Sequence, residues 1–177
     1  NGKKITFPDR KLETINYKLN QTYQGMYREI ADIISEKLTM AYYNILRYKK
    51  ENLQTQEEIL ALNRMIAIGG IFKTILLKRL ESSIEAFRIS VSRHIKFLKT
   101  MMKCLEEGKF LSKQAYTKLI KYILAEDEDF EEDSEEIEQE ILAQLDKFNI
   151  NNYNKDEMFK DIKTDIQLLG SILEKIK

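Results

Sequence analysis

The sequence predicts an all-α fold, a multi-helix bundle of long amphipathic helices that follows a short N-terminal extended segment. The 177 residues include a single proline, Pro8, and are 33% charged and 43% apolar. Such a composition is typical of long helices when apolar residues recur every three or four positions. Two stretches, 84–105 and 159–176, show that recurrence as heptad seams. Together these observations favour a bundle over a sheet protein.

Residues 1–21 are the exception and are expected to be extended. Residues 14–19 alternate polar and apolar side chains, which is the period of a strand. A lone strand leaves its backbone groups unpaired at both edges. We therefore expect this strand to join a sheet made by other residues, and the chain to be a fragment of a longer protein.

Residues 22–125 are expected to form the main helical domain, which begins with a helix capped by Thr22. The apolar stripe of this first helix consists of Met26, Ile30, Ile33, Ile34 and Leu38. A second, shorter helix is expected over residues 42–48.

A capping box, Thr55 with Glu58 three residues later, is expected to begin a strongly apolar helix. Gly69 and Gly70 interrupt the pattern of this helix. Each costs roughly 1 kcal/mol relative to alanine in a helix interior. The pair indicates either a kink or a close contact with another helix.

The most regular helix is expected from residue 84 to Gly108, a glycine typical of a helix C-terminus. Its seam has the spacing 3,4,3,4,3,4 and consists of Ile84, Phe87, Val91, His94, Leu98, Met101 and Leu105. Ser112 is expected to cap a further helix that ends near Leu124. Phe72, Phe87 and Phe97 are expected in the core.

An acidic loop is expected at residues 126–136, and C-terminal helices at 137–177. The first of these helices should contain Ile137, Ile141, Leu142 and Leu145. Asn154 is expected to cap the last helix, whose stripe consists of Phe159, Ile162, Ile166, Leu169, Leu173 and Ile176. That stripe is still amphipathic at the last residue, which again indicates a fragment.

Catalytic chemistry has few candidates in this sequence, and we expect no catalytic, cofactor-binding or metal-binding residue. Phosphate-binding glycine loops and calcium-loop patterns are missing from the sequence. The single histidine, His94, and the single cysteine, Cys104, lie ten residues apart on one predicted helix and cannot meet. His94 occupies a seam position, which favours a role in packing over a role as a ligand.

The residue composition also predicts where in the cell the protein is found. One cysteine cannot form an internal disulfide, which predicts a reduced, cytoplasmic setting. No uninterrupted apolar run reaches the roughly 18–20 residues of a membrane span, so no membrane is expected.

Charge is distributed unevenly although the net charge is zero. Residues 1–125 hold 23 Lys and Arg against 12 Asp and Glu, and residues 126–177 hold 6 against 17. Six basic residues form a candidate nucleic-acid-contacting group: Lys78, Arg79, Arg88, Arg93, Lys96 and Lys99. Because Glu81 and Glu85 lie among them, two interpretations stay open, a phosphate-contacting face and an ordinary salt-bridged helix surface.

Three strings resemble Swi/Snf-type helicases of superfamily two, in particular their bacterial, RapA-like branch. Residues 5–19, Ile-Thr-Phe-Pro-Asp-Arg-Lys-Leu-Glu-Thr-Ile-Asn-Tyr-Lys-Leu, resemble the segment that closes the first RecA-like lobe. Residues 76–83, Leu-Leu-Lys-Arg-Leu-Glu-Ser-Ser, with Ala86 and Phe87, are similar to a signature of these bacterial proteins. Residues 165–176 resemble the helix before the second lobe.

The resemblance implies a parent protein that hydrolyses ATP with Mg²⁺ and moves along nucleic acid, with DNA as the expected substrate. The family's phosphate loop, magnesium motif and arginine fingers belong to the lobes, and no residue here matches them. The leading hypothesis is therefore a helical connector between the two RecA-like lobes, without ATPase activity by itself. An isolated fragment is expected to dimerise through surface that the lobes would cover. The alternative is a stand-alone helical adaptor that binds a partner protein through its seams.

Overall fold

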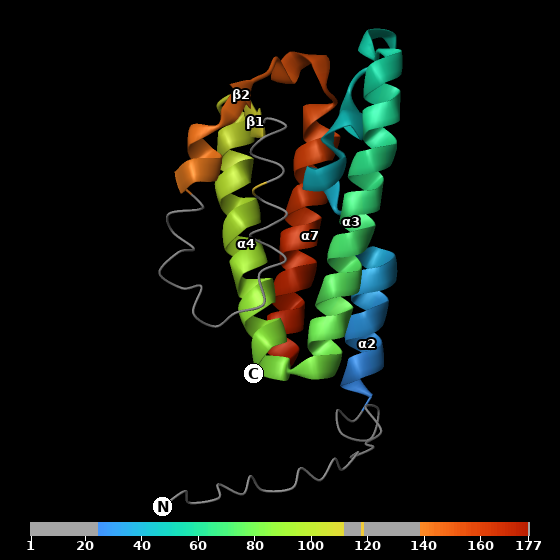
Figure 1. The fold of residues 1–177 in the computed structure, drawn as a ribbon, viewed down its shortest axis with the longest axis vertical. Helices are drawn as coiled ribbons and strands as arrows, with labels where there is room; N and C mark the ends of the chain where they lie inside the picture. The colour runs from blue at the N-terminus through green and yellow to red at the C-terminus, as the bar shows by residue number, and fades with distance from the viewer. Residues whose placement is uncertain (1–24, 112–117, 119–138, 177) are drawn as a thin grey trace, which may run out of the picture.

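The computed structural model describes residues 25–111, 118 and 139–176, and the helical architecture is clear in it (Figure 1). Three long helices run side by side: α3 (Gln56–Ser82), α4 (Ile84–Glu106) and α7 (Lys155–Lys175). The shorter α2 (Met26–Asp32) lies beside the C-terminal part of α3. The predicted all-α class is confirmed. Several predicted features lie outside the described residues: the extended segment at 1–21 with its strand at 14–19, Thr22, the acidic loop at 126–136 and Ile137. The same holds for Ser112 and for all of the helix expected from it except residue 118.

The first described segment changes helical type twice. A π-helical turn, η1 (Ile33–Lys37), follows α2, and a 3₁₀ helix, η2 (Ala41–Tyr48), takes the place of the helix expected at 42–48. The expected stripe is buried at Ile30, Ile33, Ile34 and Leu38, and half-buried at Met26. The short helix η3 (Glu51–Leu53) leads to α3.

The loop between η1 and η2 is held by a buried carboxylate on α7. Asp165 accepts hydrogen bonds from the backbone N–H of Thr39 (2.7 Å) and of Ala41 (3.0 Å), and from the Thr39 hydroxyl (3.0 Å). Met40, between them, has a φ of 54°, a left-handed conformation that non-glycine residues rarely adopt. The hydrogen bonds of Asp165 therefore hold a strained turn in place.

Gly69 of α3 allows this turn to approach closely. A β-carbon built on Gly69 would lie 3.2 Å from the β-carbon of Met40, whereas one on Gly70 would meet nothing within 4 Å. The helix continues through both glycines to Ser82. The pair thus marks a close contact at Gly69, as one of the two interpretations predicted, but the contact is with the turn at Met40 and not with another helix.

The α3–α4 hairpin has well-defined caps. The predicted capping box is confirmed: the Thr55 hydroxyl accepts from the Glu58 N–H (3.3 Å), and the Glu58 carboxylate accepts from the Thr55 N–H (2.9 Å). Ser83 alone separates α3 from α4 and caps α4 by accepting from the Ala86 N–H (3.3 Å). A connection of one residue makes the two helices antiparallel neighbours.

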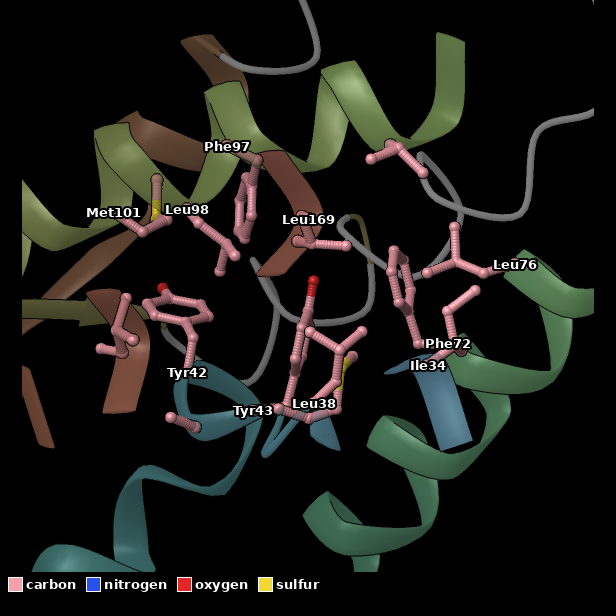
Figure 2. Packing of buried hydrophobic residues seen from close by; sticks show 14 of the residues in the cluster. Ile34, Leu38, Tyr42, Tyr43, Phe72, Leu76, Phe97, Leu98, Met101 and Leu169 are labelled. Carbon is pink, nitrogen blue, oxygen red and sulfur yellow. The ribbon is translucent and has the colours of Figure 1, made fainter. Parts of the chain in front are cut away.

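Aromatic rings fill the centre of the bundle (Figure 2). Tyr42 of η2 packs on Phe97 of α4, with 5.4 Å between ring centroids, and Tyr43 of η2 packs on Phe72 of α3 at 5.6 Å. The predicted α4 seam is buried from Phe87 to Leu105, and Ile84 is half-buried. His94 is 4% exposed, as expected for a packing histidine, and its ring centroid lies 4.3 Å from that of Phe72.

A small sheet corrects one expectation. Gly108 adopts a φ of 70° and ends α4, as predicted, and β1 (Lys109–Leu111) follows it. This strand pairs antiparallel with β2 (Leu145–Lys147). Leu145, expected in a helix, instead lies opposite Leu111, because the helical turn at 139–143 ends before it and the strand pairing satisfies its backbone.

The last helix is rotated by about 50°, half of the angle between successive residues, from the predicted orientation. After η5 (Ile150–Asn152), α7 buries Met158, Ile162, Asp165, Leu169 and Ile172. Of the predicted stripe only Ile162 and Leu169 are fully buried; Phe159, Ile166, Leu173 and Ile176 pack at its edge. The rotation brings Asp165 to the Thr39–Ala41 turn. Asn154 makes no side-chain cap, and its N–H donates to the Tyr48 carbonyl (2.7 Å).

The two ends of the bundle differ. At the hairpin end, where Ser83 joins α3 to α4, the Tyr27 hydroxyl donates to Glu81 (2.7 Å) and Lys175 pairs with Glu29 (2.8 Å). The start of α2 and the end of α7 thus lie together there (Figure 1). At the opposite, capping-box end, Lys49 pairs with Glu58 (2.6 Å) and the Lys50 N–H donates to the Asn152 carbonyl (2.9 Å).

Among the residues that the structure describes, α3 alone is long and apolar enough to cross a bilayer by length and composition. Only 17% of its most apolar window is buried. The expectation that no membrane is involved stays a prediction.

Candidate nucleic-acid interface

The six predicted basic residues divide between two helices. Lys78 and Arg79 lie on the last turns of α3, and the other four lie on α4. Lys78, Arg88, Lys96 and Lys99 are exposed, whereas Arg79 and Arg93 are half-buried. The structure therefore separates the group into an exposed set and a half-buried pair.

The exposed residues of α4 share one face of the helix. Arg88, Lys96 and Lys99 are spaced by eight and then three residues, and Lys103, four residues further, is also exposed. We call Arg88, Lys96, Lys99 and Lys103 the basic face of α4. It rises by about 22 Å along the helix axis from its first to its last member. Lys103 was not predicted, although the same spacing of three and four residues could have identified it.

The half-buried pair meets at a groove between α3 and α4. A cavity of about 30 Å³ there is lined by apolar side chains of both helices together with Arg79 and Arg93; the full lining is Phe72, Ile75, Leu76, Arg79, Ser90, Arg93, His94 and Phe97. Room of this size admits about one water molecule. The groove therefore combines an apolar floor with two cations contributed by different helices.

Arg79 also ties the hairpin together. Its guanidinium donates to the Ser90 hydroxyl, and that hydroxyl donates to the Ala86 carbonyl (2.7 Å). A planar guanidinium carries five donors in a fixed fork, so Arg79 can make several such contacts at once. Sequence reasoning identified Arg79 as basic but had no signal for its contact with Ser90.

His94 contributes to the floor of the groove but adds no positive charge there. Burial lowers the pKa of His94 from 6.5 to about 3, so its imidazole is neutral at pH 7. The Tyr43 hydroxyl lies 3.4 Å from Nδ1, and the Tyr43 ring stacks on the imidazole at 5.7 Å between centroids. His94 therefore positions the groove walls by packing.

The acidic residues among the six basic ones are engaged within the bundle. Glu85 forms an exposed ion pair with Arg88, and the hydrogen bond from Arg88 lowers the pKa of Glu85. Glu81 accepts from Tyr27, and this hydrogen bond raises the pKa of Tyr27 to about 12. Exposed pairs of the Glu85–Arg88 type contribute little stability. The first residue of the basic face is thus partly neutralised, and its last residue, Lys103, has Glu106 and Glu107 as helical neighbours.

Metal and nucleophile chemistry finds little support in the described part of the chain. It contains no group of three or more His, Cys, Asp or Glu side chains that could hold a metal ion. Cys104 is half-buried, and burial raises the pKa of its thiol, which disfavours the reactive thiolate. The chemistry that the basic face of α4 and the Arg79–Arg93 groove can provide is electrostatic contact with a polyanion.

Comparisons of this chain with protein-family models, with curated proteins and with solved structures found no match.

Proposed function

We propose that this chain is the helical coupling segment between the two RecA-like lobes of an ATP-dependent DNA translocase of the Swi/Snf type. ATP and Mg²⁺ would be bound by the lobes, and this segment would have no ATPase activity of its own. One observation carries the proposal: the start of α2, the family-like string at 76–83 and the end of α7 meet at the hairpin end. A segment that connects two lobes needs its incoming and outgoing chain close to both.

The packing supports a role as a rigid unit. The hairpin is closed by Ser83 and braced by the Arg79–Ser90 contact, and α7 is tied to the η1–η2 turn through Asp165. Long helices with such cross-links move as rigid bodies, so closure of the lobes on ATP would swing this segment as a whole.

The basic face of α4 and the Arg79–Arg93 groove are the surfaces that we propose contact the DNA backbone. Lysine and arginine contacts to phosphates provide affinity without sequence preference, and each contact adds about 0.9 to the slope of log K against log salt. Three contacts from Lys96, Lys99 and Lys103 would together contribute a slope of about 2.7.

The test is binding of the purified chain to fluorescent duplex DNA across a salt series. Reversal of Lys96, Lys99 and Lys103 to glutamate should weaken binding at low salt and reduce the salt slope by about 2.7. The matched control reverses Lys155, Lys160 and Lys163, which are exposed on α7 and change the net charge equally. Equal loss of DNA affinity in both variants would show that net charge, and not the basic face of α4, determines binding. In a separate assay, ATP hydrolysis by the chain alone would contradict the connector proposal.

The second candidate function is a stand-alone helical adaptor. Its binding surface would not be the predicted seam of α4, which is buried from Phe87 to Leu105 within the bundle. The adaptor function is favoured by the exposed apolar side chains of the N-terminal half of α3, which lie away from the hairpin end. The coding sequence on either side distinguishes the two functions. A phosphate loop upstream and a second motor lobe downstream support the connector, and start and stop codons that flank this segment support the adaptor.

A further inference from the structure

The N-terminal half of α3 presents an apolar face that the bundle does not cover. Its large aliphatic side chains are half exposed or more: Ile59 is 50% exposed, Leu60 61%, Ile66 52% and Ile71 52%. Helical periodicity places these four side chains around the small residues Ala67 and Gly70, which are also exposed, with one exposed polar residue, Asn63, among them. We call the four aliphatic residues together with Ala67 and Gly70 the open face of α3. A cluster of large exposed apolar side chains on one face of a protein is typical of a site of interaction.

A bilayer does not fit the open face. The C-terminal half of α3 is fixed in the core by Phe72, Leu76 and Leu80, and Gly69 is packed against Met40. Only residues 56–71 remain available, a helix about 24 Å long, against the roughly 30 Å of hydrocarbon that a span must cross. Arg64 is moreover exposed in the middle of this stretch.

The charges that flank the open face are arranged for self-association. Glu57 is exposed at the beginning of α3, and Lys78 is exposed near its end. If two α3 helices pair antiparallel with Ala67 on the two-fold axis, residue 57 of one copy lies opposite residue 77 of the other, one position from Lys78. The acidic end of each helix then meets the basic end of its partner, and the helix dipoles are also antiparallel. Parallel pairing would place like charges together.

We propose that two copies of this chain associate through the open face of α3 in an antiparallel, two-fold symmetric dimer. Ile59, Leu60, Ile66 and Ile71 of each copy form its apolar centre, and the Glu57–Lys78 pairs lie at its two ends. The contacting face, from Glu57 to Lys78, is about 32 Å long and one helix wide, which is small for a stable interface and predicts a concentration-dependent dimer. The inference does not rest on the helicase proposal, since the apolar centre of the face lies in the N-terminal half of α3.

Light scattering of the chain across a wide concentration range tests the association. The wild type should shift from monomer to dimer as concentration rises, and Ile66→Glu should remain monomeric. The control is Ile89→Glu, a half-buried isoleucine on α4, which should dimerise as the wild type does. A monomer at every concentration, or a dimer that Ile66→Glu leaves intact, overturns the proposal.

Charge exchange tests the orientation. Glu57→Lys and Lys78→Glu should each weaken the dimer, and the double variant should restore it, because each antiparallel contact then carries swapped charges. Cross-linking gives a readout independent of affinity. In a Cys104→Ser background, the double variant Leu60→Cys/Thr74→Cys should form disulfides between copies. Residue 60 of one copy lies opposite residue 74 of the other in the proposed register.

Leu60→Cys alone should not form a disulfide between copies, and a disulfide in that variant would indicate parallel pairing and refute the model. Flotation of the chain with phosphatidylcholine vesicles, abolished by Ile66→Glu, would show that lipid covers the open face and would also overturn the proposal.

Discussion

Acidification should destabilise this protein through one histidine. His94 is 4% exposed in the centre of the bundle, and its pKa is lowered by burial to about 3. In the unfolded chain the same imidazole titrates near its ordinary value of about 6.5. The unfolded state therefore binds the proton first as the pH falls. The stability that His94 contributes is fully present above about pH 6.5 and is lost progressively as the pH falls toward 3.

The magnitude follows from the two pKa values. One proton taken up only by the unfolded state changes the free energy of unfolding by up to 1.36 kcal/mol per pH unit. Between about pH 7.5 and pH 4.5, with the unfolded histidine titrating at 6.5, the loss amounts to about 2.7 kcal/mol. This is a large fraction of the stability of a typical domain.

The assay is urea unfolding followed by helical circular dichroism at several pH values, for the wild type and His94→Gln. Glutamine is neutral at every pH tested, while the carboxylates that also titrate are the same in both proteins. The difference in free energy of unfolding between the two should therefore change by about 2.7 kcal/mol over this range. Parallel pH profiles would refute the argument that burial keeps His94 neutral.

Five further substitutions, at four positions, test the packing by the same unfolding assay. Gly70→Ala should stabilise α3 by about 1 kcal/mol, because its β-carbon meets nothing within 4 Å, whereas Gly69→Ala should lose that gain against Met40 at 3.2 Å; equal effects would contradict the close contact. Asp165→Ala should cost about 2–5 kcal/mol, since it removes the acceptor of two backbone N–H groups, and Asp165→Asn should cost less. Thr55→Ala should cost about 1 kcal/mol through loss of the cap, and no change would show that Glu58 holds the turn through Lys49 instead.

The sequence predicted the elements that depend on local chemistry. The capping box at Thr55, the seam of α4 and the glycine that ends it are confirmed because each rests on residues within one or two turns of each other. His94 was placed in the core for the same reason, since its seam position outweighed its polarity.

Contacts between distant residues could not be read from local pattern. Asp165 looks like a solvent-exposed carboxylate by residue type, yet it faces the core because its partners, Thr39 and Ala41, lie more than 120 residues earlier. Its inward position rotates α7 relative to the predicted stripe. The pairing of β1 with β2 has a similar origin, because three-residue strands are too short to show an alternating pattern.

The candidate nucleic-acid interface likewise has a part that local sequence spacing predicts and a part that depends on contacts between distant residues. The sequence grouped the basic residues of α4 together, and the structure leaves Arg88, Lys96 and Lys99 exposed on one face but half-buries Arg93. The groove that joins Arg79 to Arg93 depends on how α3 and α4 turn about their axes after Ser83, which one-dimensional spacing does not determine.

The ion pair between Glu29 and Lys175 has a mechanical consequence. Because α2 begins and α7 ends at the same extremity, a pulling force applied through these two helices would not stretch the bundle along its length. It would first separate the Glu29–Lys175 pair and then peel the helices apart turn by turn. Only a few contacts would bear load at any moment, so the protein should unfold at low force in this pulling geometry. Tension along α3, applied between Thr55 and Ser82, would instead have to break the contacts along its whole packed length at once, which requires a higher force.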